Sequence, residues 1–113
     1  MKTSHAQALE EVTHLFLNIR KQPKGDQDAG WDALERRMTQ LFEEGWTRKE
    51  LYHLASEIMT SFSSLPEEHY DDVSNYLDGL IGWVATGCIT RFPGEPTDPD
   101  ELAAYVLGMK WLE

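Results

Sequence analysis

The stretch from 66 to 87, PEEHYDDVSNYLDGLIGWVATG, constrains the fold more than any other part of this 113-residue chain. Placed on a helix, it carries a bulky apolar stripe on one side. The stripe consists of Val73, Leu77, Leu80 and Val84, with Ile81 beside it. Small side chains follow the opposite side at the same spacing: Asn75, Gly79, Gly82 and Thr86. Such a helix can be packed on both sides, so the stretch predicts a central helix over about 66–87.

Apolar periodicity and capping residues predict four further helices. Their predicted ranges are 4–21, about 28–44, 47 to the region of 61–64, and 98–112. Thr47 and Glu50 have the spacing of a capping box, and Gly45 suits the left-handed residue that ends the preceding helix. Asp98 is predicted to cap the last helix, with Pro99 at its first position. The sequence therefore predicts an all-α single domain, residues 1–113, with about five helices.

The start of the central helix carries a second capping pattern, with Ser64 as the cap and Glu67 three residues later. Pro66 is tolerated in a first helical turn, because that turn leaves its backbone N–H groups unpaired. Ser64 is therefore expected to accept a hydrogen bond at the beginning of this helix.

Charge is the strongest departure from average composition, with 20 acidic and 10 basic residues and a net charge of −10. Clustered lysine and arginine are needed to contact phosphate backbones. The basic clusters of this chain have acidic residues nearby; they are Arg20-Lys21-Lys24, Arg36-Arg37 and Arg48-Lys49. The charge therefore argues against nucleic acid and anionic membrane, and favours a basic protein partner.

The single cysteine, Cys88, permits no disulfide within the chain, which fits a reducing compartment. Because it follows the predicted central helix near the apolar stripe, Cys88 is interpreted as a buried structural thiol. The N-terminal residues lack the apolar run of a signal peptide, and no stretch has the length of a membrane span. We expect a soluble cytoplasmic protein.

Two Glu-x-x-His motifs, Glu11 to His14 and Glu50 to His53, match the spacing of di-iron bundle ligands. Both histidines lie far from the apolar stripes of their helices, so the motifs are not expected to converge on a metal. Nucleophilic catalysis would need Cys88, a serine or a threonine paired with a histidine, but Cys88 follows the C-terminus of the predicted central helix, where the helix dipole disfavours a thiolate, and the four histidines are scattered. No glycine-rich phosphate loop is present. The sequence predicts a protein that is not an enzyme and that needs no cofactor.

Two interpretations of the acidity stay open: the carboxylates solvate the outer faces, or they dock a basic partner. Under the second interpretation, we hypothesise that the chain is a binding protein that neutralises a basic protein. A toxin-immunity protein or antitoxin that inhibits a bacterial toxin effector such as a nuclease is the leading example. The alternative is a structural or adaptor subunit that forms homo- or hetero-oligomers through exposed aromatic residues such as Trp111. A monomer and a homodimer are therefore both considered.

Two surfaces are candidates for partner binding. The first is the start of the central helix, with Glu67, Glu68, Tyr70, Asp71 and Asp72. The second is the loop and cap before the last helix, with Phe92, Glu95, Asp98, Asp100 and Glu101. For Phe92 the alternative is a structural role, as a plug over the end of the central helix.

Overall fold

The computed structural model describes residues 2–19, 21, 27–84 and 86–109. Within these ranges the chain forms α-helices, short 3-10 turns and no β-strand. The α-helices are α1 (His5–Ile19), α2 (Gln27–Glu43), α3 (Arg48–Ser61), α4 (Glu67–Ile81) and α5 (Pro99–Leu107). The 3-10 turns are η1 (Phe62–Ser64) and η2 (Thr86–Cys88). The predicted all-α fold of about five helices is confirmed.

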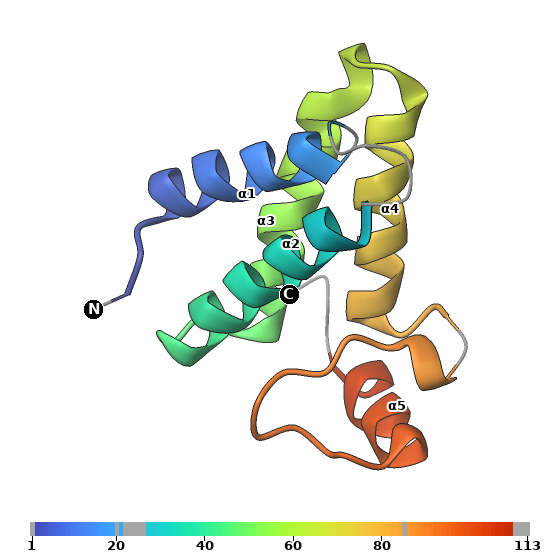
Figure 1. Cartoon of the computed structure of the whole chain (residues 1–113). Helices are drawn as coiled ribbons and strands as arrows, with labels where there is room; N and C mark the ends of the chain where they lie inside the picture. The colour runs from blue at the N-terminus through green and yellow to red at the C-terminus, as the bar shows by residue number, and fades with distance from the viewer. Residues whose placement is uncertain (1, 20, 22–26, 85, 110–113) are drawn as a thin grey trace.

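The central position of α4 is also confirmed, since it packs against α1, α3 and α5. The other extensive contact joins α1 to α2. Figure 1 shows α5 at the far end of α4, reached through a long irregular connection after η2. The helices therefore form a main bundle, α1 to α4, with α5 attached at one end.

The main core contains most of the residues predicted from periodicity. Its buried members from the first three helices are Ala8, Val12, Phe16, Ile19, Leu34, Met38, Leu41, Leu51, Leu54, Ala55 and Ile58. Val73, Tyr76, Leu77 and Leu80 join it from α4, and Trp46, Phe62 and Phe92 from η1 and the connecting segments. A small second cluster, Ile89, Leu102 and Val106, holds α5 in place. Burying each large aliphatic side chain contributes about 1.5–3 kcal/mol before the entropy of folding is subtracted.

Local capping signals determine several helix ends. Thr47 accepts a hydrogen bond from the backbone N–H of Glu50, whose own side chain accepts from the Thr47 N–H, so the predicted capping box is confirmed. Asp98 caps α5 and Pro99 is its first residue, also as predicted. After α2, Gly45 has a φ of +116° and the Trp46 N–H donates to the Leu41 carbonyl at 3.1 Å. This is the left-handed helix end that the glycine predicted.

The predicted end of α4 at Gly87 is wrong, because the helix stops at Ile81. Gly82 has a φ of +86°, and the Trp83 N–H returns to the Asp78 carbonyl at 2.9 Å. A glycine adopts this left-handed conformation without the steric cost that a side chain brings. The small residue that was expected to provide packing space in mid-helix therefore ends the helix.

The capping box predicted at Ser64 is wrong as well. Pro66 is the N-cap of α4, and no side chain accepts a hydrogen bond there. Ser64 instead ends the 3-10 turn η1.

At the other end of the chain α5 stops at Leu107, short of the predicted 112, and 110–112 lie outside the described residues. No helix in the described ranges is long and apolar enough to cross a membrane.

Candidate functional site

The start of α4 presents three exposed carboxylates, Glu67, Glu68 and Asp71, which we call the acidic α4 surface. Their spacing of three and four residues places them side by side on the helix. Among the described residues, none of the ion pairs involves these three. Tyr70 and Leu65, in the same turn and just before it, are 39% and 38% exposed. The surface thus combines unpaired negative charge with two accessible apolar side chains.

Asp72 does not belong to this surface, although the sequence placed it there. It is only 4% exposed and is engaged within the fold. At one residue beyond Asp71 its direction turns by about 100°, which points it toward the bundle. The partner-binding role predicted for Asp72 is therefore withdrawn.

The second predicted surface loses its aromatic anchor. Phe92 is 1% exposed and stacks on Phe42 with ring centroids 4.9 Å apart. Glu95 is 6% exposed and accepts hydrogen bonds from the Phe92 N–H at 2.8 Å and from Arg48 at 2.9 Å. Neither side chain reaches the surface, so both are corrected from partner contacts to core residues.

Three acidic residues of that second surface remain exposed at the start of α5: Asp98, Asp100 and Glu101. Asp98 has a local role, since its carboxylate accepts from the Glu101 N–H at 3.1 Å. Carboxylates in a first helical turn also interact favourably with the helix dipole. The structure gives Asp98 a capping function, places Asp100 and Glu101 in the first turn of α5, and leaves no exposed aromatic side chain among the predicted members.

The buried partner of Glu95, Arg48, was missed by the sequence analysis, which counted it in a surface basic cluster. Arg48 is 2% exposed, and its guanidinium donates to the carbonyls of Leu80 at 2.8 Å and Gly79 at 3.2 Å. It thereby satisfies carbonyls at the end of α4 that have no partner within the helix. Burial lowers the pKa of Arg48, against the opposing effect of Glu95, but a guanidinium remains protonated in proteins.

One signal for this role is present in the sequence. Arg48 is the first residue of α3. A cation is disfavoured by the helix dipole at that end. Its presence there indicates a specific anionic partner elsewhere in the chain.

An open groove of about 710 Å³ lies between α1 and α2. Its apolar side chains are Leu15, Leu17 and Ala33, and its basic ones are His14, Lys21, Arg36 and Arg37. Glu11, Asn18 and Gln40 complete the lining. The sequence analysis missed this groove because it followed only the strongest apolar stripe, to which Leu17 does not belong.

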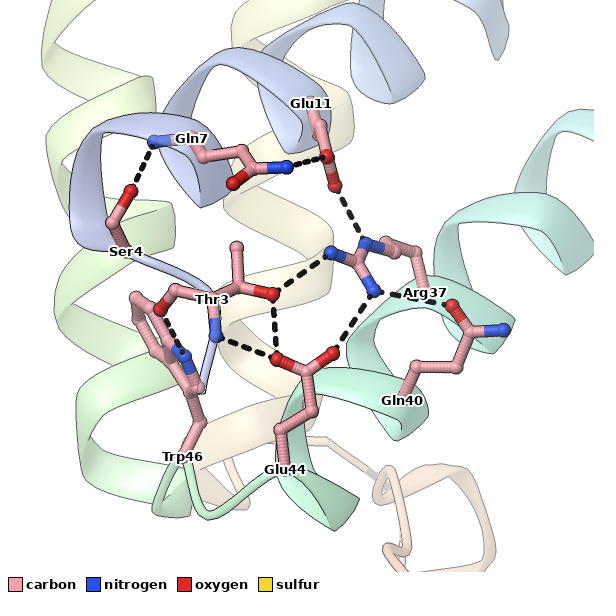
Figure 2. A network of polar contacts seen from close by, with 8 residues as sticks. All are labelled: Thr3, Ser4, Gln7, Glu11, Arg37, Gln40, Glu44 and Trp46. Carbon is pink, nitrogen blue, oxygen red and sulfur yellow. Dashed lines mark hydrogen bonds and ion pairs between the residues drawn. The ribbon is translucent and has the colours of Figure 1, made fainter. Parts of the chain in front are cut away.

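A polar network links groove-lining residues Glu11, Arg37 and Gln40 to the N-terminal segment (Figure 2). Arg37 donates to Glu11 at 2.7 Å, to Gln40 at 3.2 Å and to Thr3 at 3.2 Å, and lies 3.5 Å from Glu44. Hydrogen bonds from Thr3, and then the charge of Arg37, lower the pKa of Glu44.

The same network anchors the residues that precede α1. The Thr3 N–H donates to Glu44 at 2.7 Å, and its carbonyl accepts from the Trp46 indole at 3.1 Å. Lys2 adds an ion pair of 3.0 Å with Glu50. The network therefore holds the N-terminal segment against the corner between α2 and α3.

Cys88 is exposed, which corrects the prediction of a buried thiol. The helix ends before it, so η2 carries Cys88 away from the apolar stripe of α4. It lines a cleft of about 250 Å³ together with Glu35, Tyr76 and Thr90. Within the described ranges no side chain forms a hydrogen bond with the thiol.

In this cleft, burial and the charge of Asp32 raise the pKa of Glu35. Burial and the charge of Glu35 raise the pKa of the Tyr76 phenol. The Tyr76 hydroxyl has no hydrogen-bond partner and is enclosed by protein. Because this hydroxyl is enclosed, we assign no catalytic or binding role to it.

The two Glu-x-x-His motifs do not come together in one site. Glu11 pairs with Arg37, and Glu50 serves the capping box of α3. His14 and His53 are exposed, as their helical positions predicted. Within the described ranges no three histidine, cysteine or acidic side chains are grouped to hold a metal ion.

No protein-family model matches the chain, and comparison with curated proteins and with solved structures finds no similar protein.

Proposed function

We propose that the protein is a non-enzymatic binding protein that docks a basic protein through the acidic α4 surface. The observation that carries the proposal is the set of exposed, unpaired carboxylates Glu67, Glu68 and Asp71 beside the half-exposed Tyr70. Complementary charge speeds the encounter of two proteins and selects between partners. A half-buried tyrosine surrounded by charged residues is a frequent anchor of tight interfaces.

The partner class follows from the same charge. A nuclease must present positive charge to its nucleic acid, so a protein with this surface is suited to cover it. The specific form that we propose is a toxin-immunity or antitoxin protein that inhibits a bacterial toxin effector, acting in the cytoplasm. The chain requires no cofactor for this role.

The test is triple charge reversal of the acidic α4 surface, Glu67→Lys, Glu68→Lys and Asp71→Lys. Wild-type and variant proteins are immobilised, basic proteins are captured from a lysate of the source organism, and the captured partner is then studied by stopped-flow. We expect the variant to associate at least about tenfold more slowly at low salt, with a flatter salt dependence. If the partner is a nuclease, the wild-type protein should inhibit it and the variant should not.

The matched control is Asp28→Lys, Asp32→Lys and Glu43→Lys at exposed positions of α2, which makes the same change in net charge. It should retain fast association. If the association rate fell equally in both triple variants, only the total charge would matter, and the acidic α4 surface would be removed as the docking site.

A second candidate function, an adaptor that acts through a helical oligomer, is favoured by one observation. Trp83 is 74% exposed at the end of α4, and Leu107, 58% exposed, lies over the neighbouring Gly82. Trp111, the aromatic residue expected to serve this role, lies outside the described residues. Sedimentation velocity separates the candidates: a monomer supports the inhibitor, and a homodimer lost on Trp83→Ala supports the adaptor.

A further inference from the structure

We propose that the groove between α1 and α2 binds an acidic amphipathic helix of a partner protein. The chain would then carry a second docking surface, opposite in charge to the acidic α4 surface. This inference is independent of the proposed function, since it rests on other residues and on a partner of the opposite charge.

The shape of the groove suits a helix. The α1 wall is built from Glu11, His14 and Asn18, with Lys21 just beyond the helix, and the α2 wall from Ala33, Arg36, Arg37 and Gln40. The helical members of both walls repeat every three to four residues, so each wall follows one side of its helix. From Glu11 to Asn18 the α1 wall extends for about 10 Å, or nearly two helical turns. A groove between two packed helices is a common receptor for a third, amphipathic helix.

Apolar contact is available along this groove. Leu15, Leu17 and Ala33 are only partly buried, and each lines the hollow. Leu15 and Leu17 pack at the margin of the main core but are not part of its fully buried set. An incoming helix with leucines on one face would cover them and remove apolar surface from water.

Charge decides the chemistry of the occupant. Arg37 is already paired with Glu11 and Glu44. Lys21 and Arg36 are exposed on the groove, and neither side chain forms an ion pair or a hydrogen bond with another residue in the described ranges. These cations therefore remain available for carboxylates that flank the apolar face of a bound helix.

The surrounding charge distinguishes a protein helix from nucleic acid. The net charge of −10 repels a polyphosphate. A short helix instead brings a few carboxylates, which match a few cations, and leucines, which match the apolar lining. The observations thus favour an acidic helix over RNA or DNA.

The probe is a fluorescein-labelled peptide of about 15 residues, the length of α1, with leucines on one helical face and glutamates on the other. Two controls have the same length: a scrambled peptide of identical composition, and a version with lysine in place of glutamate. Fluorescence anisotropy with the full chain at low salt gives the affinities. We expect the amphipathic acidic peptide to bind at least about tenfold more tightly than either control.

The chain variants are Arg36→Glu and, as a matched control, Lys49→Glu on α3, which does not line the groove. Arg36→Glu should weaken binding of the acidic peptide by about tenfold or more, while Lys49→Glu should bind as wild type does. Circular dichroism verifies that both variants are folded.

Nitrogen–proton NMR spectra locate the bound peptide. The largest shifts on titration should fall at Leu15, Ala33 and Arg36. The proposal is overturned if the scrambled peptide or a single-stranded oligonucleotide binds equally well. Equal affinity of the two variants, or shifts centred outside the groove, would overturn it too.

Discussion

Two arginines join distant parts of the chain in opposite environments. Arg48 and Glu95 are buried, with side chains 1% and 3% exposed, and Arg48 also serves two backbone carbonyls. Arg37 is 20% exposed and shares its guanidinium among several partners at the edge of the α1–α2 groove. The first site is isolated from water and salt, whereas the second remains accessible to both.

The comparison separates two roles for an ion pair. Buried charges cost several kcal/mol each to desolvate, so a buried pair adds little net stability but makes the loss of one partner expensive. Exposed pairs contribute about 0–1 kcal/mol each and weaken as salt is added. We therefore interpret the Arg48–Glu95 pair as fixing how α3, the end of α4 and the following loop pack together. The Arg37 network adds a small stabilisation between α1, α2 and the N-terminal segment.

The largest expected effect comes from Glu95→Ala, which leaves the buried guanidinium without its counter-charge and the Phe92 N–H without its acceptor. We expect the free energy of unfolding to fall by about 3–5 kcal/mol. Urea denaturation followed by tryptophan fluorescence measures it. The double variant Arg48→Leu/Glu95→Leu is the control and should recover part of the loss. A loss below about 1 kcal/mol for Glu95→Ala would show that water reaches the pair.

A smaller effect is expected from Arg37→Ala, which removes hydrogen bonds to Glu11, Gln40 and Thr3 together with the ion pair to Glu44. The free energy of unfolding should fall by about 1–2 kcal/mol in dilute buffer. The adjacent Arg36→Ala, with an exposed side chain, should stay within about 0.5 kcal/mol of wild type. Repeating the denaturation in about 1 M salt should reduce the difference in the free energy of unfolding between wild type and Arg37→Ala.

The smallest effect concerns pH. Hydrogen bonds from Thr3 lower the pKa of Glu44 in the folded chain below its ordinary value of 4.5. The unfolded chain therefore binds the proton more tightly, so this stabilisation is present above the unfolded pKa and disappears as pH falls through the folded pKa. Glu44→Gln should flatten the stability curve between about pH 5 and 3. The matched variant Glu43→Gln should keep the wild-type slope, and equal slopes in all three proteins would contradict the role of Glu44.

The sequence predicted those features that are determined within a few residues. The Thr47 capping box, the Asp98 cap and the Gly45 helix end each depend on side chains and backbone angles in one turn. Apolar periodicity likewise predicted the buried faces, because a helix that packs on a core must repeat its apolar residues. The class of fold followed from these local signals.

The errors arose where a residue has two allowed uses and distant contacts choose between them. Gly82 fits a small-residue stripe and a left-handed helix end equally well in sequence. Phe92 and Glu95 are residue types that occur in exposed binding hot spots. They are buried here because Phe92 stacks on Phe42 and Glu95 pairs with Arg48, each about 50 residues earlier in the chain. The sequence predicted all three members of the acidic α4 surface but also included Asp72, which is buried. The α1–α2 groove was not predicted, because it forms only when the two helices pack together.

The link between Arg48 and Glu95 also has a consequence for synthesis. The two residues are separated by 47 positions, and Glu95 follows α4 in the chain. A nascent polypeptide that has already emerged through α4 still lacks the carboxylate that neutralises its buried guanidinium. Translation must therefore continue past α4 to position 95 before the buried guanidinium has its counter-charge, and a message truncated before that position yields a chain with an unmatched internal charge.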